Sequence, residues 1–328
     1  MNAKRASMAD VAALAGVSAQ TVSRVVNGSA RVDPATRDRV EAAMLECGYR
    51  VHRAARALRT GRSGTIGAVV STLATVGNSL MLEAVTDAAA SRGYDVAVVT
   101  LRDGAASALE RLREQGVDGV VVINEASALA RSAELPVGLR LAVVDSPPDD
   151  RYSGVETDHV GGATAATAYL LDLGHATVSH LAGPATSYAA SERERGWRSA
   201  LDDRGVERGE PVRGSWSSAS GYEAARLLIE TRAIGTALFV ANDQMALGAL
   251  RALADAGLRV PEDVSVVGFD DVADAANYRP PLTTVRQDFH TLGEAAVAAL
   301  LDETGTGGRH VVAAPLVERG SAAAPTAT

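Results

Sequence analysis

The sequence predicts a two-part fold, an N-terminal all-α helix-turn-helix head followed by an α/β core of two parallel-sheet lobes. In residues 1–62, apolar side chains recur at helical spacing and basic side chains gather. From Gly64 onward, apolar runs alternate with amphipathic helical stretches, a pattern typical of parallel sheets covered by helices. The roughly 265 residues of this second part are too many for one small sheet, so two similar lobes are expected.

Charge is distributed unevenly along the chain. The whole sequence carries a formal charge of -8, but residues 1–62 hold eleven basic and five acidic side chains, a balance of +6. The remaining residues therefore carry -14. A basic head on an acidic body indicates a nucleic-acid-binding module joined to a second function. A solvated surface with fluctuating charge is the alternative at this point.

Composition narrows the class of protein further. The single cysteine, Cys47, excludes an intrachain disulfide framework and favours a reducing compartment. We find neither an apolar run of about 18 residues nor a secretory leader, so a cytoplasmic location is expected. Metal-ligand spacing, a phosphate-binding loop and a nucleophile constellation are also missing from the sequence, so we expect no cofactor and no enzymatic activity.

The stretch MADVAALAGVSAQTVSRVVNG predicts two short helices around a tight turn. Gly16 suits the left-handed end of the first helix, and Ser18 suits the N-cap of the second. Val22, Val25 and Val26 give the second helix one apolar face. A third helix is expected from the cap Asp33 and Pro34 to Gly48.

The second helix has the side chains of a helix that reads DNA in the major groove. Gln20 has the geometry to pair with adenine, and Arg24 with guanine. An ordinary three-helix bundle with exposed polar residues would have the same spacing. The residues expected to contact phosphates are Ser7, Ser18, Thr21, Ser23, Asn27, Arg31, Thr36, Arg53 and Arg56.

The predicted strands of the core are apolar runs, and polar residues collect where several of them end. The runs occupy residues 65–71, 95–101, 118–124, 141–145, 177–183, 236–242 and 264–269. Ligands in such folds bind beyond the carboxyl ends of the strands. With Trp216 as an aromatic face, Asp145, Arg193, Asn242 and Asp270 suit a neutral, hydroxyl-rich ligand such as a sugar. Each aspartate could instead be a helix cap, and the tryptophan a core residue.

The head resembles a known family closely. MADVAALAGVSAQTVSRVVNG and VDPATRDRVEAAMLECGYR are similar to the DNA-binding head of the lactose-repressor (LacI/GalR) family of bacterial transcription regulators. This resemblance implies a homodimer on a pseudo-palindromic operator, with bases read by Ala19, Gln20 and Arg24. It also implies a hinge helix in residues 51–63 whose Leu58 enters the minor groove. Val51 and His52 depart from the family's proline and asparagine there.

The core resembles the same family's effector-binding domain, which is similar to periplasmic sugar-binding proteins. The stretches LGHATVSHLAGP, LFVANDQMALGALRALADAGLRVPEDVSVVGFDD and RPPLTTVRQDFHTLGEAAV carry this likeness, especially to lactose-type members. It places lobe one at about 64–157 plus a segment after 289, and lobe two at about 158–286. The effector contacts implied are Ser79, Asp145, Arg193, Trp216, Asn242, Asp270, Gln287 and Phe289. Thr75–Gly77 would add to the lobe-one wall, and Ala189 replaces a serine that contacts sugar.

The leading interpretation is a repressor that an inducer, expected to be a galactoside-like sugar, releases from its operator. Residues 1–50 form the head, 64–320 the core and 321–328 a disordered tail, and the tail's lack of leucine heptads favours a dimer over a tetramer. Two alternatives stay open. One is a regulator whose DNA binding is tightened by a purine or a phosphocarrier protein, and the other is a solute-binding protein.

Overall fold

The computed structural model describes residues 6–26, 29, 31–49, 61–101, 104–124, 138–302 and 308–326. The chain divides into two compact units, Met1–Ser63 and Gly64–Thr328. Several residues named above lie outside the described part of the chain: Asn27, Val51, His52, Arg53, Arg56 and Leu58.

The head contains helices α1 (Met8–Ala15), α2 (Ala19–Val26) and α3 (Pro34–Glu46). Gly16 adopts φ 65° at the end of α1, and Ser18 Oγ accepts the Thr21 N–H at 3.1 Å at the start of α2. Asp33 caps α3 by accepting the Thr36 N–H, with Pro34 at the first helical position. These local signals set the end of α1 and the starts of α2 and α3, as the sequence predicts.

A small apolar core holds the head helices together. Val11, Val22 and Val40 come from the three helices and are fully buried. Burying each valine side chain contributes roughly 1.5–3 kcal/mol of hydrophobic free energy. The opposite face of α2, with Ala19, Gln20 and Arg24, stays in solvent.

The first sheet, in lobe one, is entirely parallel, with the order β11-β5-β4-β3-β1-β2. Its strands are β1 (Thr65–Val70), β2 (Asp95–Thr100), β3 (Val120–Val122), β4 (Leu141–Val144), β5 (Ser153–Thr157) and β11 (Arg309–Val312). Helices α5 (Val76–Ser91) and α12 (Phe289–Leu301) pack on one face, and α6 (Ala105–Glu114) packs on the other. Both faces of the central strands are therefore buried, which explains their continuous apolar sequences.

The second sheet, in lobe two, has the order β12-β10-β9-β8-β6-β7 and is parallel except for β12. Its strands are β6 (Ser179–Ala182), β7 (Val212–Arg213), β8 (Ala237–Val240), β9 (Ser265–Asp270), β10 (Thr283–Arg286) and β12 (Leu316–Val317). Helices α10 (Ser218–Glu230) and α11 (Asp243–Asp255) cover one face, and α8 (His159–Asp172) and α9 (Tyr188–Asp202) cover the other. A 3₁₀ helix, η1 (Ala273–Asn277), follows β9.

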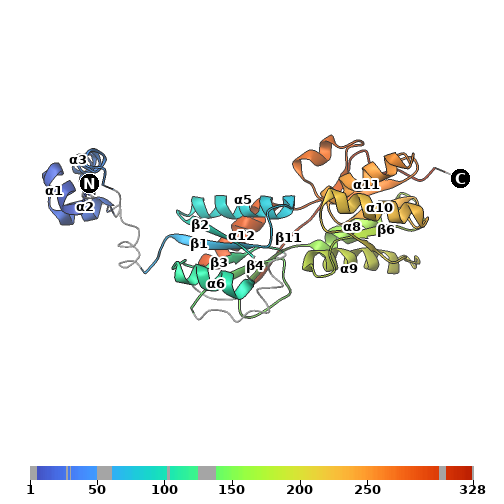
Figure 1. Ribbon diagram of the computed structural model, residues 1–328, viewed down its shortest axis with the longest axis horizontal. Helices are drawn as coiled ribbons and strands as arrows, with labels where there is room; N and C mark the ends of the chain where they lie inside the picture. The colour runs from blue at the N-terminus through green and yellow to red at the C-terminus, as the bar shows by residue number, and fades with distance from the viewer. Residues whose placement is uncertain are drawn as a thin grey trace. The chain divides into compact units, whose positions relative to one another are not determined.

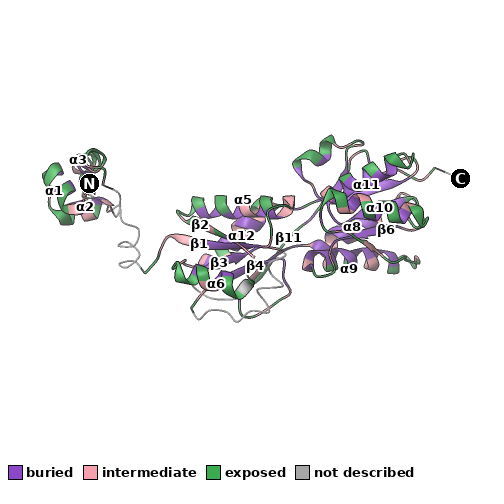
Figure 2. Ribbon diagram, viewed as in Figure 1, coloured by how far each residue is buried: buried purple, intermediate pink, exposed green. Residues whose placement is uncertain are grey.

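The chain passes repeatedly between the two lobes. It crosses after β5 into α8, returns from β10 into α12, and crosses again from β11 to β12. Figure 1 shows these segments at the junction of the lobes, and Figure 2 shows that the sheets are buried while the outer helix faces are exposed. The head-plus-α/β fold class expected from the sequence is confirmed. None of the described helices is long and apolar enough to cross a membrane.

The expectation of a disordered tail after residue 320 is wrong for residues 321–326. Ser321 is fully buried, and its carbonyl accepts the Val266 N–H at 2.8 Å. Its hydroxyl donates to the Val266 carbonyl and accepts the Thr283 N–H, so it bridges β9 and β10. Small, polar residues suggest disorder, but here they satisfy backbone groups at the end of the second sheet.

Candidate functional site

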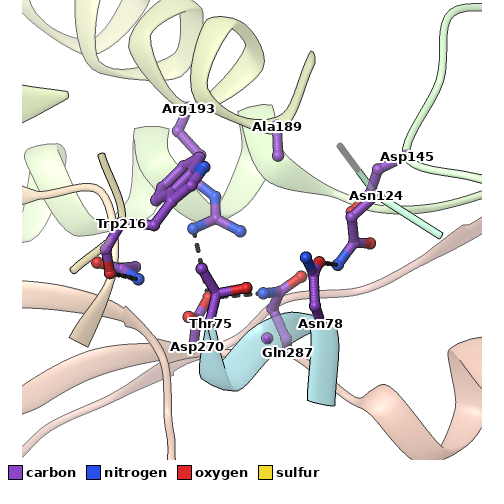
Figure 3. A pocket seen from close by; sticks show the side chains of 11 residues that line it. Thr75, Asn78, Asn124, Asp145, Ala189, Arg193, Trp216, Asp270 and Gln287 are labelled. Carbon is purple, nitrogen blue, oxygen red and sulfur yellow. Dashed lines mark hydrogen bonds and ion pairs between the residues drawn. The ribbon is translucent and has the colours of Figure 1, made fainter. Parts of the chain in front are cut away.

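A pocket lies between the two lobes, at the carboxyl ends of their strands. The empty space within it, part of which is open solvent, amounts to about 400 Å³. Figure 3 shows Trp216 and Asp145 at opposite ends. The lining residues are Thr75, Gly77, Asn78, Asn124, Asp145, Ala189, Arg193, Trp216, Asn242, Asp270 and Gln287.

Trp216 is held at its end of the pocket by close contact with the backbone. Its ring covers Gly183, where a Cβ atom would lie 2.4 Å from the indole. The Asn242 amide donates to the Trp216 carbonyl at 3.2 Å, while its oxygen caps α11 by accepting the Met245 N–H. Asn242 is thus both a helix cap and a pocket residue. A capping role at this strand end therefore does not exclude a role in ligand binding. Gly183 makes room for the indole ring, because any larger residue would displace it.

Arg193 reaches the centre of the pocket from α9. Its guanidinium lies 3.8 Å from the centre of the Phe269 ring and 5.5 Å from that of Trp216. It donates to the Ala241 carbonyl and, at 3.3 Å, to Asp270. Although only 4% exposed, this cation is therefore satisfied within lobe two.

Asp270 and Gln287 join this network at the edge between β9 and β10. The Gln287 amide donates to Asp270 Oδ1 at 2.6 Å and accepts the Thr157 hydroxyl at 2.7 Å. Burial raises the pKa of Asp270, although the Arg193 charge and the Gln287 hydrogen bond oppose that shift. Thr157 belongs to lobe one, so Gln287 links the lobes at the floor of the pocket.

Asp145 supplies a second buried carboxyl, from the end of β4. Its Oδ1 lies 2.9 Å from His159 Nε2 and accepts the Thr157 N–H at 3.2 Å. Burial raises the pKa of this carboxyl, but attraction to His159 and Arg193 outweighs burial, so the pKa lies below its usual value. Asp145 therefore presents a carboxylate to the pocket at neutral pH.

Two asparagines in lobe one complete the wall. Asn124 donates to Asn78 Oδ1 at 2.9 Å, and Asn78 donates to the Thr72 carbonyl at 2.9 Å. Sequence reasoning missed both residues. The strand-end rule that selected Asp145 would have found Asn124, which follows β3, whereas the sequence pattern does not distinguish Asn78 from other residues of α5.

Ser79 and Phe289 are not among the residues that line this pocket. Ser79 follows Asn78 on α5, where successive side chains point about 100° apart, and its hydroxyl donates to the Leu73 carbonyl. Phe289 packs against the apolar core of lobe one, with its ring tip 4.0 Å from the Cβ position of Gly77. Asp145, Arg193, Trp216, Asn242, Asp270 and Gln287 are brought together at the pocket.

In the head, the residues expected to read bases lie on the exposed face of α2. Ala19, Gln20 and Arg24 are exposed, as is Arg31 beyond the helix. Ser7 and Thr36 donate their hydroxyls to Asp10 and Asp33, and the hydroxyls of Ser18 and Thr21 hydrogen-bond to each other. Ser23 is half-buried on α2. The cap hydroxyls are thus already engaged within the head.

Known proteins match both parts of the chain. Residues 7–51 match bacterial regulatory proteins of the lacI family, and residues 167–322 match a periplasmic binding protein-like domain. The chain is 36% identical over 335 residues to the lactose operon repressor of Escherichia coli K12, covering 98% of this chain and 92% of the relative. This chain belongs to the lacI family of bacterial regulatory proteins. The resemblance inferred from the sequence is therefore confirmed, and the chain is a DNA-binding transcription regulator.

Two other lacI-family relatives match at similar levels. The transcriptional regulator CelR of Thermobifida fusca is 38% identical over 318 residues, covering 91% of this chain and 92% of CelR. The transcriptional repressor PurR of Pasteurella multocida is 32% identical over 309 residues, covering 90% of this chain and 91% of PurR.

Solved structures agree with this assignment. The lac repressor dimer bound to operator and the anti-inducer ONPF matches with a TM-score of 0.85 and 34% identity, covering 98% of this chain and 100% of that one. The complex of CelR with cellobiose matches with a TM-score of 0.72 and 35% identity, covering 97% and 100%.

Proposed function

We propose that this protein is a transcriptional repressor, released from operator DNA by an uncharged sugar bound between its lobes. The observation that carries the proposal is the pocket: one aromatic face, Trp216, surrounded by carboxyl, amide and guanidinium groups. An indole ring stacks on the apolar face of a pyranose, while the polar groups hydrogen-bond its hydroxyls. The complexes of CelR with cellobiose and of the lac repressor with ONPG support a sugar.

The charges in the pocket favour a neutral ligand over an anion. Arg193 is the only cation among the described lining residues, and it already faces Asp270. Asp145 keeps its negative charge because its pKa is lowered. A phosphorylated sugar would therefore meet a carboxylate with no unpaired cation to compensate. Galactosides and glucosides without phosphate are the expected class.

In this proposal, release from DNA requires an effector that contacts both lobes. Asp145 belongs to lobe one, whereas Arg193 and Trp216 belong to lobe two. An effector that bonds to both lobes favours one relative orientation of the lobes. Moving operator occupancy from 99:1 to 1:99 takes about 5.5 kcal/mol of differential binding, which a dimer shares between two pockets.

On the DNA side, we assign base reading to Ala19, Gln20, Arg24 and Leu58. Backbone contacts are assigned to Ser7, Ser18, Thr21, Ser23, Asn27, Arg31, Thr36, Arg53 and Arg56. The exposed polar face of α2 supports this assignment, because a recognition helix must present side chains to base edges. The residues in 51–63 act, in this proposal, as a hinge helix with Leu58 as a minor-groove wedge.

We place this protein in the cytoplasm as a homodimer, and its exposed apolar surface supports the dimer. Leu73 and Leu247 are 46% and 44% exposed, and Leu73 borders a surface groove along α5. The lining of this groove includes Leu73, Val76, Leu80 and Leu82, and a continuous apolar surface of this kind indicates a protein interface. The dimeric lac repressor structure supports a second copy of this chain as the partner.

Sugar binding is tested by the fluorescence of the chain's two tryptophans. Trp216 lines the pocket, whereas Trp197 is 1% exposed in the core of lobe two. Lactose, cellobiose, ribose, hypoxanthine and glucose 6-phosphate are titrated into the full-length protein. We expect a neutral sugar to change the emission of wild type and Trp197→Phe but not of Trp216→Phe. Tighter binding of the phosphate or of hypoxanthine would contradict a neutral sugar effector.

Repression is tested by fluorescence polarisation with the palindrome nearest upstream of the coding sequence. The expected result is tight binding that weakens when the bound sugar is added. DNA binding that tightens with hypoxanthine would identify a corepressed regulator instead. If the protein bound sugar but no DNA, a solute-binding role would replace the proposal.

A further inference from the structure

On the α9 side of the junction, the two lobes are joined by three polar side chains. The Tyr188 hydroxyl, from α9 in lobe two, donates to Glu156 Oε2 at 3.0 Å. Glu156, from β5 in lobe one, also pairs with the Arg309 guanidinium of β11. Arg309 donates to the Tyr188 oxygen at 3.1 Å, which closes the triangle.

The chemistry of this cluster favours a single geometry. Glu156 is 7% exposed, and a carboxylate removed from water needs donors that face it, which here are Tyr188 and Arg309. Burial, followed by the Glu156 charge, raises the pKa of Tyr188, so the phenol stays protonated and donates. Hydrogen bonds to ionised groups are about twice as strong as neutral ones and are directional.

The cluster is connected to the pocket through neighbouring residues in each lobe. Glu156 precedes Thr157, whose N–H donates to Asp145 and whose hydroxyl donates to Gln287. Tyr188 precedes Ala189, which lines the pocket on α9. A change in the distance between Glu156 and Tyr188 would therefore also move the pocket walls to which they are attached.

The opposite side of the junction is held differently. There the Val76 N–H, at the start of α5, donates to Gln244 Oε1 of α11 at 3.0 Å. Val76 and Leu80 also pack against the apolar core of lobe two. Figure 1 shows α5 and α9 on opposite sides of the junction. Apolar contacts do not impose a direction, and the Val76 hydrogen bond joins two neutral groups, so the charged cluster is the better candidate for fixing lobe orientation.

We propose that Tyr188, Glu156 and Arg309 form an inter-lobe clasp that holds the effector-free protein in one orientation of its lobes. The clasp sets the ratio between this orientation and others, and it thereby sets the starting point from which an effector acts. The proposal goes beyond the assigned function, because it concerns the ligand-free protein and requires no particular sugar.

The test measures the distance between the lobes directly. Spin labels are placed at exposed positions, Gln115→Cys in lobe one and Asp203→Cys in lobe two, in full-length protein carrying Cys47→Ala. Excess unlabelled protein ensures that the measured pairs lie within one chain. Double electron–electron resonance is then recorded without ligand.

The double variant Tyr188→Phe, Glu156→Gln should show a second population of distances. We expect the ratio of clasped to unclasped molecules to fall roughly ten-fold, the change expected from loss of one charge-assisted hydrogen bond. Tyr188→Phe alone should give the same ratio as the double variant, because both bonds between the lobes pass through the Tyr188 hydroxyl, and it guards against misfolding of the double variant.

Arg92→Gln is the matched control, because Arg92 pairs with Glu294 at 2.6 Å entirely within lobe one. Its distance distribution should equal that of the parent protein. An unchanged distribution in both clasp variants, or an equal change in the control, would overturn the clasp. Neither result depends on whether a sugar is found to bind.

Discussion

At the scale of single residues, His180 is a buried polar group that the pocket does not use. It is 1% exposed in the core of lobe two and stacks on Phe239, with a ring-centre distance of 4.9 Å. Its Nδ1 bonds to the Phe239 carbonyl, whereas its Nε2 has no hydrogen-bond partner among the described residues. Burial lowers the pKa of His180 to about 4, outweighing the opposing effect of the Phe239 carbonyl. This histidine is therefore neutral in the folded protein at pH 7.

Replacing His180 should change how stability depends on pH. Below its ordinary pKa of 6.5 the unfolded chain binds a proton that the folded protein excludes until about pH 4. Wild type therefore loses about 1.4 kcal/mol of unfolding free energy per pH unit within that window. In His180→Leu this loss is absent, so the variant should gain about 2 kcal/mol relative to wild type between pH 7 and pH 5.

Urea unfolding followed by tryptophan fluorescence at pH 7, 6 and 5 measures this difference. Trp197 is a direct reporter because its ring lies 5.2 Å from that of His180. His310→Leu, at an exposed histidine, is the control. A difference between His180→Leu and wild type that stays constant with pH would show that His180 does not titrate on unfolding.

At the scale of elements, the sequence predicts the central strands and the polar residues at their ends, but it does not predict the short edge strands. The continuous apolar runs predict β1, β4, β8 and β9 because both faces of a central parallel strand are buried. The two-residue strand β12 has no such pattern. It forms because β10 offers it hydrogen-bonding groups at the edge of the second sheet.

The segment after β12 should contribute measurably to stability. Ser321→Ala removes the acceptor for the buried Thr283 N–H and the donor to the Val266 carbonyl. An unsatisfied buried group costs about 1–3 kcal/mol, so we expect a loss of that size. Thermal or urea unfolding of the full-length chain provides the measurement.

Thr326→Ala is the matched control, because the Thr326 hydroxyl donates to Glu262 in an exposed position. Its unfolding free energy should stay within about 0.5 kcal/mol of wild type. Equal effects of the two substitutions would mean that the buried hydrogen bonds of Ser321 contribute no more to the free energy of unfolding than the exposed hydrogen bond of Thr326.

At the scale of the whole molecule, the two units carry net charges of opposite sign. A balance of +6 in residues 1–62 against -14 in the remainder confines attraction for DNA to the head. Binding that neutralises phosphates releases counterions, so operator affinity should fall steeply as salt concentration rises. The acidic core, for its part, disfavours non-specific binding of DNA along its surface.

Arg31→Ala should reduce the slope of log affinity against log salt by about 0.9, because Arg31 is exposed and assigned to one phosphate. Polarisation titrations of the operator from 50 to 200 mM salt, a range in which such slopes are resolved, measure it. Arg259→Ala, at an arginine paired with Asp263 in lobe two, should leave the slope unchanged. Equal slopes for all three proteins would remove Arg31 from the interface.

The sequence by itself determined the head, the strand-and-helix alternation of the core and much of the pocket. Caps such as Ser18 and Asp33 act on backbone groups a few residues away, and the apolar spacing of Val22 and Val25 is also local. Both signals can therefore be recognised from the sequence alone. Asp145 and Asp270 could be selected as candidates because parallel strands bring their carboxyl ends to one edge of a sheet.

Only the tertiary structure decided which of these side chains share a cavity and how they are oriented. It selected Asn78 rather than its neighbour Ser79, because the direction of a helix relative to the pocket is set by packing. It ordered Ser321 through groups more than thirty residues away, and it brought Tyr188 of one lobe to Glu156 of the other. These contacts join residues far apart in the chain, and their partners exist only once both lobes have folded.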